Sequence, residues 1–297
     1  LYLAGADRFL ITEAIRGEGG VLRTKSGEAF MERFHPLADL APRDIVSRSI
    51  LEIMKETGNN KVWLDLGAIA PERIRERFPR ILELSRSFGI DILSQPIPVR
   101  PSAHYSIGGI STDSHGRTSV PGLLAAGEAA CTRVHGANRL GSNSLLEGLV
   151  FGHRSGIEAA RAAADITRPE PSQAVDPGGG SPAAEAAKNP GGDLDLADLL
   201  SSLKSLVWYK VGVERNGEDL SNALEQLSAW TAYPLAADFR DVESWTLQNM
   251  LQTSWLLTYC ALRRRESRGV HFRADHPERD DVNFRRHMSI SRADFST

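Results

Sequence analysis

Residues 134–147 read VHGANRLGSNSLLE, which is a polar, glycine-rich loop followed by the start of a helix. The loop crowds a histidine, an arginine, a serine and two asparagines together, and an apolar helical pattern then runs from Ser144 to about Ala164. Free backbone N–H groups at a helix N-terminus suit an anion or an electron-rich ring edge. Because a purely structural role explains this combination poorly, the stretch predicts a ligand site.

Two stretches upstream of this loop carry related signals. His104-Tyr105-Ser106-Ile107-Gly108-Gly109 follows an extended, proline-containing stretch at 97–101. Leu123–Glu128 has the pattern of a buried strand. We therefore interpret residues 96–165 as one segment that carries the loop and its helix.

Residues 1–95 mix short strands with helices. Apolar pairs flank Ser26-Gly27, which predicts a hairpin, and Lys61–Leu66 predicts a further strand. A helical period begins at Pro42, where a first turn tolerates proline, and Pro71 begins a second helix that extends to about Phe88. Together with the helices downstream, these strands predict an α+β fold.

The last part of the chain has a different composition. Residues 166–193 are rich in proline, glycine and alanine with almost no large apolar residue, which is typical of a linker. From residue 194 to about Arg265 the apolar period is helical, which predicts a small antiparallel bundle in a domain at 194–297. Tryptophans at helical positions in this domain are interpreted as core residues: Trp208, Trp230, Trp245 and Trp255.

Two shorter clusters near the N-terminal end each allow two interpretations. Residues 12–20 (TEAIRGEGG) place charges beside glycines, which let a backbone approach a ligand closely but also form an ordinary hairpin turn. Arg43 begins a helix, where the macrodipole favours anions, so it either holds a bound anion or forms an exposed ion pair. His153 and His271 have no paired ligand spacing, so we do not expect them to bind a metal.

Composition argues against several classes of protein. The net charge of −3 gives no reason to expect a nucleic acid or an anionic membrane as a partner. No apolar run approaches the roughly 18 residues that a membrane-spanning helix needs. Cys131 and Cys260 are far apart in sequence, which suits a reducing, cytoplasmic compartment better than a disulfide framework. No charged-then-apolar leader follows Leu1, so no secretory signal is visible.

Taken together, the motifs resemble the succinate dehydrogenase/fumarate reductase flavoprotein family. The resemblance covers nearly the whole chain except residues 169–192. The motifs that carry it are Thr12-Glu13-x-x-Arg16-Gly17-Glu18-Gly19, Arg43-Asp44-x-Val46-x-Arg48, His104-Tyr105-x-x-Gly108-Gly109, Gly122-Leu-x-Ala-x-Gly127-Glu128, the run from His135 to Glu147, and Glu266-Ser267-Arg268-Gly269-Val270-His271. Within the family, Leu40–Val46 and Pro96–Tyr105 are most similar to the L-aspartate oxidases.

The resemblance implies a dicarboxylate site that faces a flavin. His104 and Arg139 would bind the substrate carboxylates, the arginine through a bidentate fork. Thr12 and Glu13 would line the other side. Arg43 matches the arginine to which the family assigns proton transfer, and because arginine is almost never neutral, that role requires a relay through neighbouring carboxylates.

The resemblance also implies FAD as the cofactor. Glu128 would bind its ribityl or ribose hydroxyls, and Asn143, Ser144 and Leu145 would meet the isoalloxazine edge at the helix start. The implied reaction is the oxidation of L-aspartate to iminoaspartate, with oxygen or fumarate as electron acceptor. It is the first step of quinolinate and NAD biosynthesis, so a quinolinate synthase is the implied pathway partner. A succinate dehydrogenase or fumarate reductase flavoprotein subunit and a non-catalytic assembly module remain the alternatives.

One family motif is absent. The Gly-x-Gly-x-x-Gly that seats the FAD pyrophosphate occurs nowhere in the 297 residues. We therefore interpret residues 1–95 as a partial capping domain, residues 96–165 as the returning segment of the FAD-binding domain, and residues 194–297 as the C-terminal helical domain. On this interpretation the chain is cut from a longer protein, and we expect the isolated chain to be inactive as an oxidase.

Overall fold

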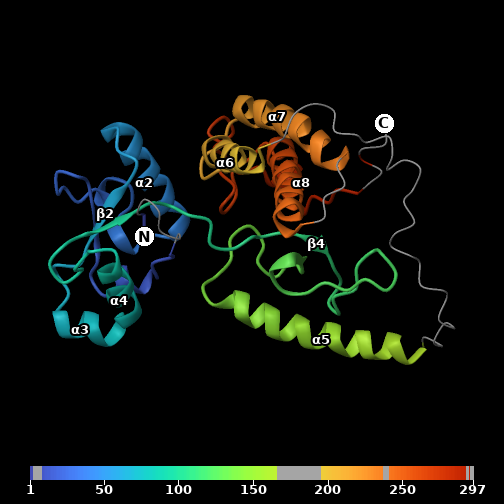
Figure 1. Cartoon of the computed structure of the whole chain (residues 1–297), viewed down its shortest axis with the longest axis horizontal. Helices are drawn as coiled ribbons and strands as arrows, with labels where there is room; N and C mark the ends of the chain where they lie inside the picture. Colours follow the sequence, from blue (N-terminus) through green and yellow to red (C-terminus); the bar gives the residue numbers. More distant parts are fainter. Residues whose placement is uncertain (3–8, 166–194, 237–240, 292–293, 295–297) are drawn as a thin grey trace. The chain divides into compact units, whose positions relative to one another are not determined.

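The structure is a computed structural model, and it describes residues 1–2, 9–165, 195–236, 241–291 and 294. The chain divides into two compact units, Leu1–His104 and Tyr105–Thr297, whose elements are labelled in Figure 1. The linker predicted at 166–193 lies outside the described residues. Helices and strands occur together in the described residues, which confirms the α+β class.

The first unit contains an antiparallel sheet of three strands in the order β1-β2-β3. Its strands are β1 (Val21–Arg23), β2 (Val62–Asp65) and β3 (Ile97–Val99). Leu22 pairs with Leu64, and Leu64 pairs with Ile97, so a row of buried aliphatic side chains crosses one face of the sheet. An antiparallel bridge between Arg23 and Ala29 confirms the hairpin predicted around Ser26-Gly27.

Short helices and two longer ones complete this unit. They are α1 (Ala14–Gly17), η1 (Met31–Arg33), η2 (Ala38–Leu40), α2 (Arg43–Thr57), α3 (Pro71–Arg77) and α4 (Pro79–Ser87). In α2 the residues Val46, Ile50 and Ile53 form a buried stripe at helical spacing. The helix ends at Gly58, whose φ of 63° is the left-handed conformation that glycine adopts without strain.

The single helix predicted from Pro71 to Phe88 is wrong, because the structure has two helices there. α3 ends at Arg77, and α4 begins at Pro79. Proline has no N–H to donate and disfavours helical geometry in the residue before it, and Phe78 accordingly has φ −131° and ψ 44°.

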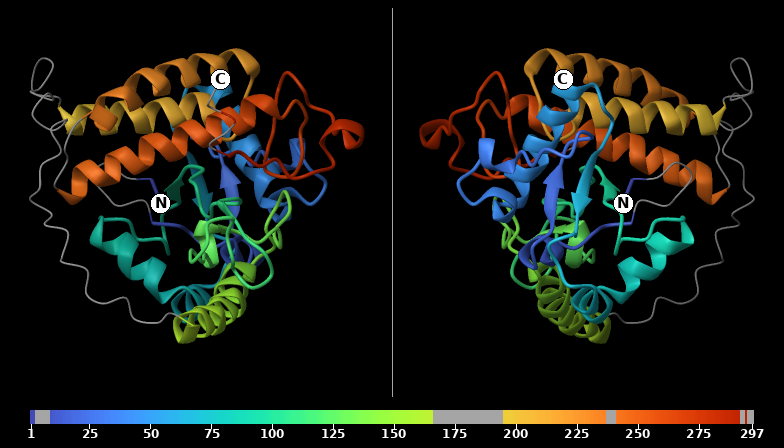
Figure 2. Two further views of the ribbon diagram at one scale, coloured as in Figure 1. Left: turned by 90° about the vertical axis from the view of Figure 1, so that its right-hand side faces the viewer. Right: turned by 90° about the vertical axis from the view of Figure 1, so that its left-hand side faces the viewer.

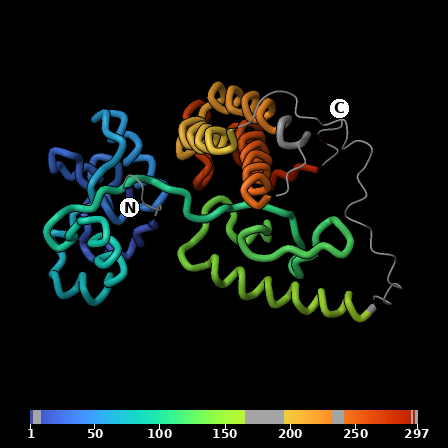
Figure 3. The backbone as a smooth tube through the Cα atoms, viewed as in Figure 1, coloured from blue at the N-terminus to red at the C-terminus, as the bar shows by residue number. Residues whose placement is uncertain are grey.

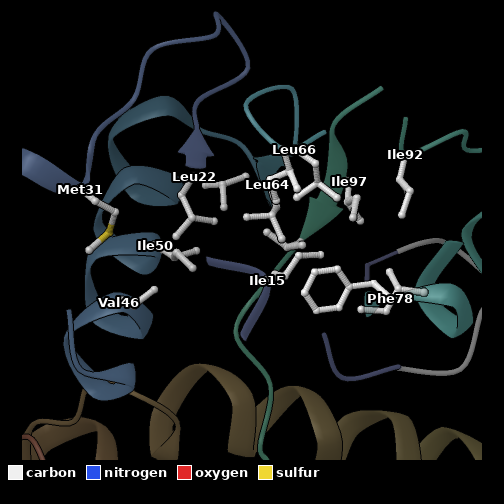
Figure 4. Packing of buried hydrophobic residues seen from close by; sticks show 14 of the residues in the cluster. Ile15, Leu22, Met31, Val46, Ile50, Leu64, Leu66, Phe78, Ile92 and Ile97 are labelled. Atoms are coloured by element: carbon white, nitrogen blue, oxygen red, sulfur yellow. The ribbon is translucent and has the colours of Figure 1, made fainter. Parts of the chain in front are cut away.

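The core of the first unit is aliphatic, and it fixes the elements that carry the candidate site. Figure 4 shows Ile15 of α1, Ile50 of α2 and Leu64 of β2 packed in one cluster. Ile15 is 1% exposed, and its side chain anchors α1 in this core. Burial of one such side chain stabilises the fold by roughly 1.5–3 kcal/mol. The polar residues Thr12 and Glu13 directly precede α1.

The trace between β3 and the second unit is extended, with no helix or strand assigned over residues 100–109 (Figure 3). The elements of the second unit are β4 (Ile110–Ser111), η3 (Gly127–Ala129), β5 (Ala130–Cys131), α5 (Asn143–Asp165), α6 (Leu196–Leu206), the π-helical turn η4 (Val207–Val211), α7 (Gly217–Ala236), α8 (Val242–Arg263) and α9 (Asp281–Phe284). β4 and β5 pair in parallel. α5 confirms the long helix predicted after the glycine-rich loop.

The predicted helical bundle is present in the second unit. α7 and α8 lie side by side (Figure 2), and α6 packs against α8. Leu220, Leu227 and Leu251 are fully buried in the core that these helices share. The four tryptophans predicted as core residues are less buried than expected. Trp208, Trp230 and Trp255 are only partly buried, and Trp245 is 50% exposed.

Residues 123–128 do not form the buried strand that their pattern predicted. Leu124 makes one bridge to Arg117, and Leu123 is 46% exposed. A buried strand needs neighbouring strands to pair with, and this segment's described residues provide only the two-residue strands β4 and β5.

Candidate functional site

Two predicted site residues meet in the first unit. Arg43 Nε donates a hydrogen bond to Glu13 Oε2 at 2.9 Å, which joins the start of α2 to the residue before α1. The side chains are 42% and 57% exposed, so the pair is open to solvent and contributes little to stability. Arg43 thus forms the exposed ion pair that was one of its two interpretations, and its role toward an anion stays a prediction. Thr12, also exposed, accepts the Ala14 N–H through its hydroxyl at 3.3 Å.

Arg16, which carried no predicted role, lies in the same electrostatic environment. Its Nη1 donates to the backbone carbonyl of Asp39, while the Asp39 carboxylate accepts the Leu22 N–H at 2.8 Å. Burial lowers the pKa of Arg16, the Glu13 carboxylate raises it, and the positive charge of Arg43 lowers it. The Asp39 carboxylate also raises the pKa of Arg16, so two arginines and two carboxylates interact here. Its position beside Gly17, in the same motif as Glu13, was the sequence feature that could have suggested a role for Arg16.

Arg139 is positioned in the second unit by an aromatic ring. Its guanidinium carbon lies 5.0 Å from the centroid of the Tyr105 ring, and Nη1 donates to the Leu140 carbonyl at 3.0 Å. A guanidinium that lies on a ring keeps its remaining donors in the plane, where a carboxylate can accept two of them. His104, the other predicted carboxylate ligand, is exposed and directly precedes Tyr105 in the chain.

Tyr105 is fixed by a buried carboxylate, Glu147, which sequence reasoning did not select. Glu147 is 3% exposed, and its Oε2 accepts the Tyr105 hydroxyl at 2.6 Å and the His135 Nε2–H at 2.7 Å. The Thr132 hydroxyl donates to Oε1. The rings of Tyr105 and His135 also meet edge to face, with centroids 5.3 Å apart. One carboxylate thus ties together both ends of the segment that presents Arg139.

The charges at this cluster are set by its hydrogen bonds. Burial alone would raise the pKa of Glu147, but the donors Thr132, Tyr105 and His135 outweigh burial and hold the pKa below its ordinary value. Burial, followed by the bond to Glu147, raises the pKa of Tyr105 to about 12. Tyr105 therefore remains a protonated donor and Glu147 an ionised acceptor near neutral pH.

Sequence reasoning missed Glu147, His135 and Thr132 as supporting residues. A glutamate in the second turn of a helix is usually solvated, so nothing local distinguished Glu147 from a surface residue. The sequence feature that could have revealed Glu147 was the recurrence of hydrogen-bond donors at the start of the motif that it ends.

We expect Glu147→Gln to loosen this cluster, because an amide nitrogen cannot accept the bonds that a carboxylate oxygen accepts. The loss leaves a buried donor without its acceptor and should lower the free energy of unfolding by about 1–3 kcal/mol. The pKa of Tyr105 should fall from about 12 toward 10. Thermal melting and phenolate absorbance, with Tyr105→Phe to assign the signal, measure the two effects. Glu225→Gln, on an exposed face of α7, is the control; equal behaviour of the two glutamines would contradict the role of Glu147.

The loop that holds Arg139 is bent by residues in the left-handed region. Arg133 has φ 69°, Gly136 has φ 55° and Ser142 has φ 66°. Non-glycine residues at positive φ are uncommon and cluster at ligand sites, where surrounding contacts hold them. Here the bends turn the chain out of β5 and into the N-terminus of α5.

The predicted cofactor residues provide two kinds of group that fit a flavin, the N-terminus of a long helix and an exposed carboxylate. Asn143, Ser144 and Leu145 form the first turn of a 23-residue helix that has no acidic residue in that turn, and Leu145 is 75% exposed. Such an open N-terminus carries partial positive charge. Glu128 is exposed and accepts the Ser106 N–H through Oε1 at 2.6 Å, and a carboxylate has a second oxygen for a hydroxyl donor.

A second buried network lies near the end of the second unit, around His271. Its Nε2 contacts the Arg264 carbonyl at 3.1 Å, and its Nδ1 contacts Arg215 Nη1 at 2.8 Å. A carbonyl only accepts and a guanidinium only donates, so the ring carries its proton on Nε2 and is neutral. Burial, then the positive charge of Arg215, lowers the pKa of His271 to about 4, although the bond to the Arg264 carbonyl acts in the opposite direction.

Acid should destabilise the second unit through His271. Between pH 6.5 and about 4 the unfolded state binds more protons at this position than the folded state, so the free energy of unfolding falls as pH falls through that window. We expect a loss of about 2 kcal/mol, measured by denaturant unfolding at several pH values. His271→Gln keeps a neutral donor and acceptor, and should remove this part of the slope. If the variant loses stability as steeply as the parent between these pH values, the neutral-histidine assignment is wrong.

Neither a metal-binding cluster nor a membrane-spanning helix occurs in the part of the chain that the structure describes. Among those residues no group of three or more histidine, cysteine, aspartate or glutamate side chains could hold a metal ion, and His153 is exposed. In the same residues no helix has the length and apolar character needed to cross a membrane.

Comparison with known families divides the chain in two. Residues 2–145 match the model of the FAD binding domain, and residues 201–296 match the model of the fumarate reductase flavoprotein C-terminus. The L-aspartate oxidase of Streptomyces coelicolor is 39% identical over 295 residues, covering 95% of this chain and 49% of that protein. The mitochondrial succinate dehydrogenase flavoprotein subunit of Oryza sativa is 37% identical over 313 residues, covering 97% and 49%. The chain spans about half the length of the curated relatives it matches.

A solved structure shows the same arrangement. A mutant of the E. coli quinol fumarate reductase chain FrdA superimposes with a TM-score of 0.75 at 32% sequence identity. The match covers 93% of this chain and 52% of that one. The fold of this chain therefore matches about half of a known flavoprotein subunit.

Proposed function

Because the chain belongs to the succinate dehydrogenase/fumarate reductase flavoprotein family, we propose that it supplies the substrate-binding residues of an FAD-dependent L-aspartate oxidase. The reaction would convert L-aspartate to iminoaspartate. The supporting observation is that the matched motif positions carry exposed or ring-stacked arginines beside carboxylates: Arg43 bonded to Glu13, and Arg139 on the Tyr105–Glu147 pair. The arginines suit the two carboxylates of an amino dicarboxylate, and the exposed Glu13 suits its ammonium.

Each side chain then has a task that its chemistry allows. Arg139 binds one substrate carboxylate through a bidentate fork, and His104 binds carboxylate oxygen through a ring N–H. Thr12 offers its hydroxyl to the same ligand. Glu13 would hold the substrate ammonium or accept its proton, which its exposed carboxylate supports.

Arg43 acts first as an electrostatic clamp. Its guanidinium stays positively charged near neutral pH, so it does not act as a base by itself. The 2.9 Å bond to Glu13 provides a carboxylate that can pass a proton on, which is the relay that the family's proton-transfer role requires.

FAD, when bound, would accept the hydride from the substrate carbon. The residues proposed to hold it are Glu128, on a cofactor hydroxyl, and Asn143, Ser144 and Leu145, at the α5 N-terminus, where the helix dipole favours negative charge. Oxygen or fumarate is the proposed final electron acceptor. Iminoaspartate would be passed to a quinolinate synthase for NAD biosynthesis. We place the reaction in the cytoplasm, which free Cys131 and Cys260 suit.

The test is flavin absorbance of the purified chain after addition of FAD, and again after L-aspartate or succinate. Bleaching by L-aspartate and not by succinate is the expected result for a chain that assembles the site. If the chain alone binds no FAD, the same measurement is made after co-expression with the unmatched half of the Streptomyces coelicolor L-aspartate oxidase. Bleaching by succinate alone would favour the dehydrogenase alternative. Full activity of the complex after substitution of Arg43, His104 and Arg139 would favour a non-catalytic assembly module.

A further inference from the structure

The loop that carries Arg139 is contacted by a turn from near the end of the second unit. The Val270 N–H donates to the Ala137 carbonyl at 3.0 Å. Gly269, the residue before it, has φ 58°, and a Cβ there would lie 2.1 Å from the same carbonyl oxygen and 2.5 Å from its carbon. Only glycine allows this approach, both because of its conformation and because of the space.

The turn itself is closed by its own backbone and by a buried acid. Arg268 and His271 exchange two backbone hydrogen bonds, at 2.8 and 3.1 Å. The Arg268 guanidinium donates to both oxygens of Glu266, at 2.8 and 2.9 Å, and to Asp281 at 2.6 Å. Glu266 is 0% exposed, so the first residue of the turn is held by a carboxylate that solvent does not reach.

The last residue of the turn is held by the helical bundle. His271 bridges Arg215, just after η4, and the Arg264 carbonyl, just after α8. Arg273, which is 2% exposed, adds bonds to the carbonyls of Ala261 and Leu262 at the end of α8. The turn is therefore held at both ends, by Glu266 and Asp281 at Arg268 and by the bonds to Arg215 and Arg264 at His271. Val270 presents its N–H between these two supports.

Ala137, whose carbonyl accepts the Val270 N–H, lies in the middle of the loop that carries Arg139. It lies between His135, which is bonded to Glu147, and Arg139, which is stacked on Tyr105. Glu147 fixes the loop through side chains, whereas the Gly269–Val270 contact fixes its backbone two residues before the arginine. Displacement of the Ala137 carbonyl would rotate the following peptides and move the guanidinium.

We propose that the Arg268–His271 turn is a positioning element that sets the backbone of the Arg139 loop and so determines how tightly the loop binds a dicarboxylate. Gly269 and Val270 act through Arg139 and do not touch the ligand. The binding part of this proposal rests on the proposed function, whereas the ordering of the loop does not. The C-terminal helical module thereby gains a specific role in the candidate site.

The test compares two glycines that share a left-handed conformation but differ in their surroundings. Gly122 has φ 80° and no atom within 4 Å of an added Cβ, so Gly122→Ala reproduces the backbone strain of Gly269→Ala without its clash. Hydrogen exchange of the loop peptides 133–142 is measured for the parent chain and for both variants. We expect Gly269→Ala to raise exchange there by about tenfold or more, with α7 and α8 unchanged and Gly122→Ala close to the parent. Equal exchange in the two variants would overturn the proposal.

Dicarboxylate binding gives the second readout, measured as the dissociation constant of L-aspartate with the FAD-loaded chain or the complemented complex. Gly269→Ala should weaken binding by about tenfold and raise KM more than it lowers kcat, because the loop orients a binding group. Arg268→Lys, which keeps the charge beside Glu266 but loses the fork, should shift both readouts in the same direction if Gly269→Ala does not fold. Absence of dicarboxylate binding by the parent would refute the proposed function, while hydrogen exchange would still decide the role of the turn. Unchanged dicarboxylate binding and unchanged hydrogen exchange in Arg268→Lys would overturn the positioning role of the turn.

Discussion

Replacement of Glu266 by alanine is expected to lower the free energy of unfolding of the second unit by about 3–5 kcal/mol, the usual effect of removing one partner from a buried ion pair. Glu266 is 0% exposed and accepts bonds from Arg264 at 2.5 Å, from Arg268 at 2.8 and 2.9 Å, and from the Asp280 N–H at 3.0 Å. The alanine variant leaves two guanidinium groups in a half-buried environment without their shared carboxylate. The desolvation already incurred by the arginines is then no longer offset.

Thermal and denaturant unfolding followed by circular dichroism measure this effect. Glu225→Ala, an exposed carboxylate on α7, is the matched control and should change stability by less than about 0.5 kcal/mol. Burial alone would raise the pKa of Glu266, but its donors, Arg268 first, hold it below the ordinary value, so its stabilising effect is present above the unfolded pKa and is lost as pH falls through the folded pKa. A Glu266→Ala loss no larger than that of the control would show that the arginines are adequately bonded without it.

Local patterns predicted the elements of the fold well where one residue type dominates the outcome. The stripe of Val46, Ile50 and Ile53 specifies α2, and the glycine-rich loop specifies the start of α5. The patterns failed where one residue interrupts a continuous apolar period, as Pro79 does between α3 and α4. They also failed at Leu123–Glu128, because burial of a strand depends on neighbours that its own sequence does not contain.

The candidate site was predicted by residue type but not by its supports. Glu13 and Arg43 could be selected as charged residues beside turns, but the 2.9 Å bond between them depends on the packing of Ile15 and the sheet. Glu147 ends the motif that begins at His135, but its burial and its bonds to Tyr105 and Thr132 depend on the fold. Gly269 belongs to a recognisable motif, yet the reason for a glycine there is the carbonyl of Ala137, 132 positions earlier in the chain. Contacts of that range are properties of the fold.

Arg139→Lys should weaken binding of L-aspartate by about 100-fold, even though the charge is kept. Lysine cannot present two parallel donors to a carboxylate, and its ammonium does not stack on the Tyr105 ring as a guanidinium does. Both differences act on the ligand-binding step, so KM of the complemented complex should rise by a similar factor, with a smaller change in kcat.

Arg133→Lys provides the comparison, because Arg133 is an exposed arginine at the start of the same loop. Loss of a loop guanidinium and general loosening of the loop would affect the two lysine variants alike, so only a specific role of Arg139 predicts a large difference between them. If both variants bind L-aspartate as the parent does, the substrate carboxylate is not held by this loop. If both lose binding equally, the loop conformation matters and the Arg139 fork does not. A loss confined to Arg139→Lys leaves the ring-stacked guanidinium as the group that recognises the dicarboxylate.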